Sequence, residues 1–336
     1  ARRPALRDAI GRVMSPRRPT LRDVSALAGV SPKTVSRVIN ADPAVAPATA
    51  ERVREAIRQL GFRPNPVARS LRVGRDDAIG LVVENIADPF FAEVTGAIEE
   101  VARERGMFVI VTSSGYAPEN ERTAIAGLTN RRVAGVIITP TSADHSYLGQ
   151  YLPRLPAVFV DRPPIQYDAD VVLSDNEGGA RTATEHLIRH GHRRIAFVSD
   201  RLHVYTTRLR YQGFRMAMRD AGIPVDERLV RVDSTDAQNA TAETLDLLRS
   251  APPPTAVISA NARCSLGVAR ALHLSGHTEI AHVSFDDFPA ADSLTPPVTA
   301  ISQDPDHLGR TAARLLFDRL GGETGPPRRV VLPVRL

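Results

Sequence analysis

The sequence predicts an α/β protein with a small N-terminal head of three helices and a larger, two-lobed body of parallel sheets. Three observations lead to this fold class. Between residues 20 and 64, which we call the head, apolar residues recur at helical spacing and glycines separate the helices. From residue 77 onward, in the body, short apolar runs alternate with amphipathic segments, as in parallel sheets covered on both faces. The length of 336 residues also exceeds that of an ordinary chain with a single hydrophobic core.

The charge is unevenly distributed along the chain. Residues 1–75 contain 16 Lys and Arg against 5 Asp and Glu, whereas the remainder contains 27 against 33. A basic head on an acidic body indicates that the head binds a polyanion. The alternative, for the first 19 residues, is a solvated basic tail that binds nothing.

The composition also bears on the compartment. No apolar run approaches the ~20 residues that a membrane span needs, and no apolar stretch follows the basic N-terminus as in a secretory signal. The one cysteine, Cys264, cannot form an internal disulfide and fits a reducing environment. We therefore expect a cytoplasmic protein with no membrane partner, in which Cys264 is a buried structural thiol.

The head predicts a helix-turn-helix. Thr20 can cap a first helix, and Gly29 ends it because glycine tolerates positive φ. Ser31 and Pro32 begin the second helix, and a third covers residues 49–60. The apolar positions of the second helix point inward. Its remaining side chains, which point outward, are Lys33, Thr34, Ser36 and Arg37.

This arrangement suits the major groove of DNA. In a helix-turn-helix, the second helix enters the groove, and there Lys33 and Arg37 could reach base acceptors, most often those of guanine. Any short three-helix bundle would show the same apolar pattern. The basic charge of the head favours DNA.

Four motifs of the head resemble the LacI/GalR family of bacterial repressors: TLRDV at 20–24, AGVS at 28–31, TVSRVIN at 34–40 and GFRPN at 61–65. ARSL at 68–71 resembles the family's hinge helix, so the resemblance implies a hinge helix and linker over residues 65–76. In the family, paired hinge helices lie in the minor groove and a leucine, here Leu71, wedges between base steps. The implied DNA-binding residues are Thr20, Pro32, Lys33, Thr34, Ser36, Arg37, Asn40, Asn65, Ala68, Arg69 and Leu71. One departure is Ala46, where relatives usually have a serine that caps the third helix.

The body predicts two similar series of strands and helices, and therefore two lobes. We expect strands at 78–83, 108–111, 136–138, 157–160, 171–173, 195–198, 256–258 and 282–285. We expect helices at 91–105, 119–130, 177–190, 210–221, 240–249 and 266–274. Ligands bind such sheets at the carboxyl ends of the strands.

Four polar residues follow apolar strands: Asp161, Asp175, Asn261 and Asp286. Singly, each is explained as well by a helix cap or a turn, but four at strand ends favour a ligand site. The carboxylates would accept hydrogen bonds from ligand hydroxyls, and Arg210 would supply a forked donor.

The body resembles the same family, and periplasmic sugar-binding proteins, over residues 78–336. The motifs are DPFF at 88–91, DNEGG at 175–179, HGHRRI at 190–195, RYQGF at 210–214, SFDD at 284–287 and LG at 308–309. The resemblance implies an effector-binding and dimerisation domain over residues 77–336. Its lobes would be 77–174 with 304–324, and 175–303 with 325–336. The implied effector-binding residues are Phe90, Asp161, Asp175, Arg210, Asn261, Phe285, Asp286 and Gln303.

Other positions qualify the resemblance. His190 and His192 are spaced like a metal pair, but in this motif they more often shape a turn between helix and strand. Ala262 stands where the family usually has aspartate, and Ser284 where it usually has glycine. Both positions lie close to the implied cleft, so an unusual ligand is expected.

The resemblance implies a homodimer that binds pseudo-palindromic, double-stranded operator DNA and is released by a sugar or sugar derivative. One alternative is a corepressor-activated regulator that senses a purine or other planar metabolite, with Phe90 stacked on the ring. Another is a transport-type sugar-binding protein, which would need a signal peptide and no helix-turn-helix. An enzyme is the third, but no phosphate-binding or nucleophile-elbow motif is present, and the adjacent Asp286 and Asp287 should point apart. We expect no catalytic activity, no metal and no cofactor.

Overall fold

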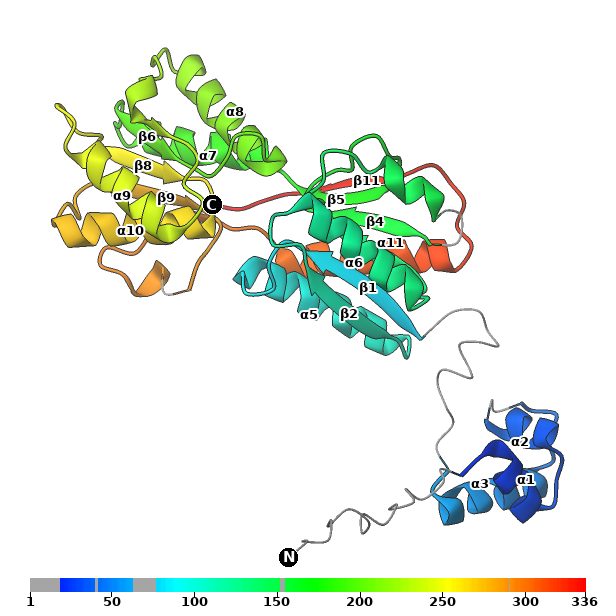
Figure 1. The fold of residues 1–336 in the computed structure, drawn as a ribbon. Coiled ribbons are helices and arrows are strands. Elements are labelled where there is room, and N and C mark those ends of the chain that lie inside the picture. Colours follow the sequence, from blue (N-terminus) through cyan, green and yellow to red (C-terminus); the bar gives the residue numbers. More distant parts are fainter. Residues whose placement is uncertain (1–18, 40–41, 63–76, 152–154, 290) are drawn as a thin grey trace, which may run out of the picture. The chain divides into compact units, whose positions relative to one another are not determined.

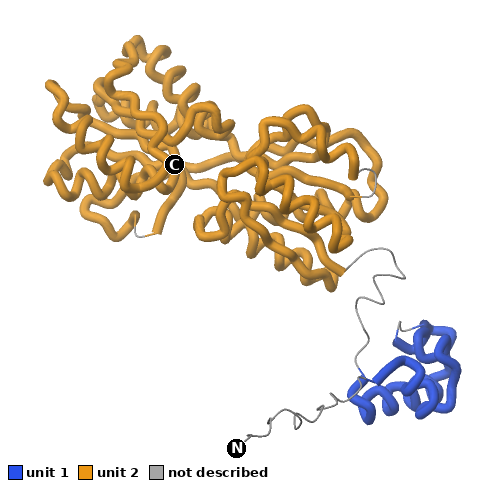
Figure 2. The backbone as a smooth tube through the Cα atoms, in the orientation of Figure 1, with its two compact units in different colours: residues 1–76 blue, residues 77–336 orange. Residues whose placement is uncertain are grey.

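The computed structural model describes residues 19–39, 42–62, 77–151, 155–289 and 291–336. The chain forms two compact units, residues 1–76 and 77–336 (Figure 2). The implied hinge helix at 65–76 lies outside the described residues. Within the described ranges, none of the helices combines the length and the apolar character that a membrane crossing requires.

The head consists of α1 (Leu21–Ala28), α2 (Pro32–Ile39) and α3 (Pro47–Leu60). A reciprocal capping box starts α1: the Thr20 hydroxyl accepts from the Asp23 N–H, and the Asp23 carboxylate accepts from the Thr20 N–H at 2.7 Å. Gly29 ends α1 with φ at +63°. Helix α3 begins two residues earlier than we expected, because Pro47 suits a first helical position. Ala46 provides no side-chain cap there.

Three valines form the centre of the head: Val24, Val35 and Val53 are fully buried, one from each helix. Phe62 closes the cluster after α3. Leu27, although apolar and within α1, is 51% exposed. Successive helical residues are rotated by about 100°, which puts Leu27 roughly 90° from the centre of the stripe formed by Leu21, Val24 and Ala28.

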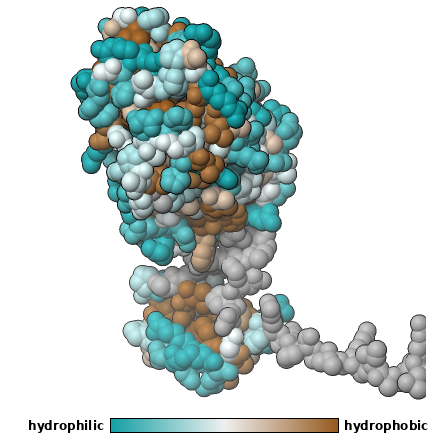
Figure 3. All heavy atoms as spheres, turned by 90° about the vertical axis from the view of Figure 1, so that its left-hand side faces the viewer, coloured by the Kyte–Doolittle hydropathy of each residue, from teal (hydrophilic) through white to brown (hydrophobic). Residues whose placement is uncertain are grey.

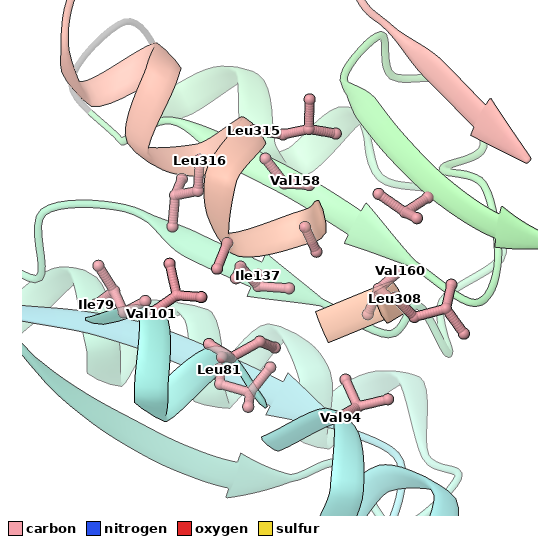
Figure 4. Packing of buried hydrophobic residues seen from close by; sticks show 14 of the residues in the cluster. Ile79, Leu81, Val94, Val101, Ile137, Val158, Val160, Leu308, Leu315 and Leu316 are labelled. Atoms are coloured by element: carbon pink, nitrogen blue, oxygen red, sulfur yellow. The ribbon is translucent and has the colours of Figure 1, made fainter. Parts of the chain in front are cut away.

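The first lobe of the body is built on a six-stranded parallel sheet in the order β11-β5-β4-β3-β1-β2. The strands are β1 (Ala78–Val83), β2 (Phe108–Ser113), β3 (Val136–Ile138), β4 (Ala157–Val160), β5 (Asp170–Ser174) and β11 (Arg329–Leu332). Helices α5 (Pro89–Glu104) and α11 (Pro305–Leu320) cover one face, and α6 (Pro118–Asn130) and a short 3-10 helix, η1 (Ser146–Gln150), cover the other. Figure 4 shows side chains of α5 and α11, such as Val94 and Leu316, packed over Ile137 and Val158 of the strands.

The second lobe has a five-stranded parallel sheet in the order β10-β9-β8-β6-β7. The strands are β6 (Ile195–Val198), β7 (Val230–Arg231), β8 (Ala256–Ser259), β9 (Ala281–Phe285) and β10 (Thr299–Ile301). Helices α7 (Asn176–Arg189) and α8 (Tyr205–Asp220) pack on one face, and α9 (Ala237–Leu248) and α10 (Ala262–Ser275) on the other. Short 3-10 helices, η2 (Glu227–Leu229) and η3 (Ala291–Ser293), lie in the loops. The two lobes are joined by extended segments (Figure 1), and on the face in Figure 3 hydrophobic patches lie between hydrophilic residues.

The predicted division between the lobes is wrong at the C-terminus. We expected residues 325–336 in the second lobe, but β11 pairs with β5 in the first sheet, and Leu332 packs in the first-lobe core. Helix α11 packs on the first sheet, and the short connection after it places β11 in that same sheet. Only the last residues reach the second lobe, where Arg335 forms a bridge with Ser302. We had not predicted β7, β10, α11 or β11 as separate elements.

A buried carboxylate holds this C-terminal segment in place. Asp170, 2% exposed at the start of β5, pairs with Arg319 of α11 and with Arg328, each at 2.7 Å, and accepts from the Arg328 N–H at 2.8 Å. Burial alone would raise the pKa of Asp170, but the two guanidinium groups lower it to about 2. One ionised side chain therefore ties α11 and β11 to the sheet.

We predict that Asp170→Asn lowers the free energy of unfolding of the body by about 3–5 kcal/mol, because two guanidinium groups lose their buried counter-ion. Asp318→Asn is the matched control: Asp318 also pairs with Arg328, at 2.8 Å, but is 52% exposed, so its loss should be below about 1 kcal/mol. Urea denaturation followed by circular dichroism measures both. Equal losses of unfolding free energy in the two variants would show that the buried ion pairs of Asp170 stabilise the body no more than the exposed pair of Asp318 does.

Candidate functional site

The outer face of α2 exposes side chains that can donate hydrogen bonds, and its inner face packs against the rest of the head. Pro32, Lys33 and Arg37 are exposed, whereas Val35 is fully buried against the head core. Arg37 lies 3.4 Å from Asp42 but keeps 52% of its side chain exposed. A short helix that presents two cationic side chains in this way can enter a major groove and donate to base edges.

Two other predicted DNA-binding residues of the head, Thr20 and Thr34, have local roles at helix ends. Thr20 caps α1, and the Ser31 hydroxyl caps α2 by accepting from the Thr34 N–H at 3.1 Å. The Thr34 hydroxyl lies 3.0 Å from that of Ser31, and Ser36 is half-buried. Asn40, Asn65, Ala68, Arg69 and Leu71 lie outside the described residues.

The body has a cleft between its lobes, at the carboxyl ends of the strands. Six of the eight predicted effector-binding residues line it: Phe90, Asp161, Arg210, Asn261, Asp286 and Gln303. Phe90 and Asp161 belong to the first lobe, and Arg210, Asn261 and Asp286 to the second. Because the lobes enclose these side chains from two sides, a molecule bound here would contact both lobes at once.

Arg210 is the central cation of the cleft, and its side chain is only 5% exposed. Its Nε donates to the Asn176 side-chain oxygen at 2.7 Å, and its Nη1 donates to the Ala260 carbonyl at 2.6 Å. The guanidinium also lies 3.3 Å from the Asp286 carboxylate and 3.7 Å from the centre of the Phe285 ring. These contacts fix its plane, and a planar guanidinium is a directional donor.

Asp286 is held from three sides. One carboxylate oxygen faces Arg210, and the other accepts from the Gln303 amide. The Ser284 hydroxyl donates to the Asp286 carbonyl, and it also lies 2.7 Å from the buried Ser265 hydroxyl. Ser284 therefore helps to hold the Asp286 backbone, whose φ of +76° is uncommon for a residue other than glycine.

Asp161 occupies the corresponding position in the first lobe, also with positive φ, at +71°. It lies 3.2 Å from Arg162, whose guanidinium makes two 2.9 Å hydrogen bonds to Glu84. Burial raises the pKa of Asp161 to about 6, although Arg162 and Arg210 oppose the shift. A buried carboxylate in a cleft with a pKa raised in this way is a candidate for a functional residue.

Two predicted residues do not line the cleft. Phe285 is 1% exposed and packs in the second-lobe core, with Arg210 stacked on its ring. Its side chain lies on the opposite face of β9 from that of Ser284, so Phe285 contacts the cleft residue Arg210 from the core. Asp175 is exposed and caps α7 by accepting from the Gly178 N–H at 2.9 Å. The next residue, Asn176, is the one that contacts Arg210.

The prediction missed several charged residues of the cleft: Glu84, Asp88, Arg162, Asp200 and Arg263. Glu84 and Asp200 directly follow the end regions of β1 and β6, so the rule that selected Asp161 and Asp286 would have found them too. Arg263 had no such signal. It follows Ala262 in α10 and reaches the cleft beside the position where the family usually has aspartate.

Arg263 connects the two lobes. It donates to the hydroxyl of Tyr116 in the first lobe, with its guanidinium 4.7 Å from the centre of that ring. On its other side it lies 3.5 Å from Asp200 of the second lobe. Beyond Arg263 the cleft continues into a cavity of 660 Å³, which we call the adjoining cavity.

The remaining candidates have structural roles. Cys264 is fully buried, and burial raises the pKa of its thiol. His190 ends α7, with its Nδ1 2.8 Å from the His186 carbonyl, and His192 lies 3.0 Å from the Thr255 hydroxyl. Within the described ranges, no group of three or more His, Cys, Asp or Glu side chains could hold a metal ion.

A helix-turn-helix head and a two-lobed α/β body with a polar cleft define a DNA-binding transcriptional regulator with a ligand-binding domain. Residues 20–65 match the family model of the bacterial regulatory proteins, lacI family. Residues 76–336 match that of the periplasmic binding proteins and sugar binding domain of LacI family. The chain therefore belongs to the LacI family.

Individual relatives agree with this assignment. The chain is 38% identical to the HTH-type transcriptional regulator CelR of Thermobifida fusca, over 84% of this chain and 86% of the relative. It is similar to the structure of a CelR–cellobiose complex, with 35% identity and a TM-score of 0.70 over 95% of this chain and 98% of that one. It is also similar to the Lac repressor dimer bound to operator and the anti-inducer ONPF, with 30% identity and a TM-score of 0.83 over 94% and 96%.

The raised pKa of Asp161 predicts a pH dependence of stability. Because the folded-state pKa, about 6, lies above the ordinary value of 3.8, ionisation of Asp161 removes stability as the pH rises through this window. As the pH rises from 4 to 7, the free energy of unfolding of Asp161→Asn should therefore increase by about 2–3 kcal/mol relative to that of the unchanged protein. Urea denaturation of both proteins across this range measures the difference. A difference that is independent of pH would contradict the prediction.

Proposed function

We propose that this chain is a dimeric repressor, released from a pseudo-palindromic operator by a sugar or sugar derivative bound in the cleft. The observation that carries the proposal is the set of fixed polar groups between the lobes, with Arg210 and Asp286 at its centre. Fixed carboxylates and a forked donor match the hydroxyls of a sugar. A similar protein, CelR, has been solved as a cellobiose complex.

The head supplies the DNA contacts in this proposal. Lys33 and Arg37 of α2 would donate to base edges, and the residues from Asn65 to Leu71 would act in the minor groove. The Lac repressor structure, a dimer bound to operator, supports this arrangement by similarity. Two heads related by a two-fold axis would read two half-sites.

The body offers two apolar surfaces for the dimer. β2 is an edge strand of the first sheet, with Phe108 75% and Val111 37% exposed. In the second lobe, Leu266 and Leu274 of α10 are 52% and 65% exposed. An apolar edge strand left open to water would be a hazard for aggregation. We propose that these surfaces pair with their equivalents in a second copy.

Ligand binding would act on DNA through the lobes. A ligand that contacts both lobes favours one arrangement of the first lobe relative to the second. In a dimer, that arrangement sets the spacing of the segments at 65–76 that lead to the two heads, and hence the affinity for the operator. We assign no catalytic step and no cofactor to the cleft, and place the protein in the cytoplasm.

A thermal-shift screen of neutral sugars, sugar acids and nucleobases, followed by release from promoter DNA, tests the proposal directly. A sugar that raises the melting temperature and releases DNA supports it, because a ligand stabilises the state that it binds. A nucleobase that raises the melting temperature and strengthens DNA binding would overturn it in favour of a corepressor. Hydrolysis of a stabilising compound would identify an enzyme instead.

We predict that Arg37→Ala reduces discrimination between operator and unrelated DNA by about 1–3 kcal/mol, because a base contact is lost. Arg54→Ala is the control: it removes a 57%-exposed arginine of α3 and should leave the ratio of the two affinities unchanged. Fluorescence anisotropy at fixed salt measures both affinities. If Arg37→Ala weakened both complexes equally, Arg37 would contact only the backbone of the DNA.

We predict that Arg210→Lys abolishes release by a ligand found in the screen while operator affinity stays within about twofold. Lysine keeps the charge but cannot reproduce the forked donor. Arg215→Lys is the control, because Arg215 lies on the exposed side of the same helix. Circular dichroism checks the fold of both variants. Normal release from Arg210→Lys would remove Arg210 from the site.

A further inference from the structure

The cleft and the adjoining cavity differ in size. The cleft around Arg210 has a volume of only 50 Å³, whereas the adjoining cavity has 660 Å³. Ligand pockets of proteins have volumes of roughly 300–1,000 Å³. A bound molecule with one end in the cleft would therefore have most of its volume in the adjoining cavity.

The two spaces also differ in charge. The cleft is lined by five carboxylates and three guanidinium groups, and the adjoining cavity by two carboxylates and four guanidinium groups. The shared lining residues balance each other, since Glu84 pairs with Arg162 and Asp200 with Arg263. The positive excess of the adjoining cavity therefore comes from Arg201 and Arg208, near the N-terminus of α8.

Arg201 and Arg208 are exposed, and neither forms an ion pair with a carboxylate of the described residues. The Arg208 guanidinium lies 5.7 Å from the centre of the Tyr205 ring, and that ring also lines the cavity. The other three arginines that line the cleft or the adjoining cavity all have carboxylate partners: Arg162 pairs with Glu84, Arg210 with Asp286 and Arg263 with Asp200. Among the arginines that line the two spaces, Arg201 and Arg208 are therefore the pair without a carboxylate partner in the described part of the chain.

The helix N-termini around the two spaces also differ: those at the cleft are capped by side chains, and those at the adjoining cavity are not. Asp88 and Asn261, at the cleft, cap α5 and α10 with their side chains. At the adjoining cavity, α6 and α8 begin after Ala117 and Val204, which make no side-chain cap. An uncapped helix N-terminus favours an anion. Helix ends and arginines therefore favour the same kind of ligand group.

We propose that the effector is an anionic sugar derivative whose carboxylate or phosphate binds Arg201 and Arg208 in the adjoining cavity. Its hydroxyls would bind Asp286 and Arg210 in the cleft. The inference rests on the proposed function, because it takes the ligand of the cleft to be a sugar derivative. Guanidinium forks bind carboxylates and phosphates with two parallel hydrogen bonds, so both anions fit the same pair.

The first experiment uses anions without a sugar. Inorganic phosphate and acetate, against chloride at equal ionic strength, are added to the full chain in a thermal-shift assay. We compare the double variant Arg201→Gln/Arg208→Gln with Arg189→Gln, which removes an exposed arginine of α7 outside both spaces. Phosphate or acetate should raise the melting temperature of the unchanged protein and of Arg189→Gln by several degrees more than that of the double variant. Equal shifts in all three proteins would overturn the proposal, and the stronger anion indicates the ligand group.

The second experiment uses matched sugars: glucose, glucuronate and glucose 6-phosphate, and the same three forms of galactose. Calorimetry should give a charged form at least about tenfold tighter binding than its neutral sugar. The double variant should lose this advantage and keep its affinity for the neutral sugar within about twofold. A neutral sugar that binds as tightly as its charged forms, and releases DNA, would overturn the inference and leave the proposed function intact. If neither the neutral nor the charged sugars bound, the inference and the proposed function would both fail.

Discussion

The need to neutralise one buried cation organises the centre of the body. Arg210 is almost completely buried, and an unpaired charge in that position would be strongly destabilising. Its partners come from the start of α7, the end of β8 and the end of β9, and its plane lies on Phe285. The groups that stabilise the charge are the same groups that shape the second-lobe side of the cleft. Stability of this lobe and geometry of its binding surface therefore depend on the same contacts.

Parallel sheets explain why the cleft lies where it does. In each lobe all strands run in the same direction, so their carboxyl ends form a single edge that carries loops and helix N-termini. The chain passes between the lobes after β5, after β10 and after β11, and the two edges face each other across these crossings (Figure 1). Asp161 and Asp286 occupy equivalent places on the two edges, both with positive φ. Two polar edges brought together form a site that neither lobe has alone.

Much of this organisation was predictable from the sequence, because it depends on local patterns. Helix caps, such as Thr20 and Ser31, and glycines at helix ends determine where the helices of the head begin and end. Apolar runs identified most strands, and the rule that polar residues follow such runs found Asp161, Asn261 and Asp286. The same rule could not distinguish Asp175, which only caps a helix, from Asn176 beside it, because one residue of rotation decides which side chain points inward.

The sequence by itself determined the two kinds of domain, the cationic face of α2 and the family, since these depend on spacing, composition and motif. Only the tertiary structure decided which charges meet. Arg162 and Glu84 are 78 residues apart, and Arg263 and Tyr116 are 147 apart, so nothing local relates them. The pairing of β11 with β5 likewise depends on how α11 packs. Long-range packing sets the balance of charge in the cleft and in the adjoining cavity, and with it the chemistry of the ligand.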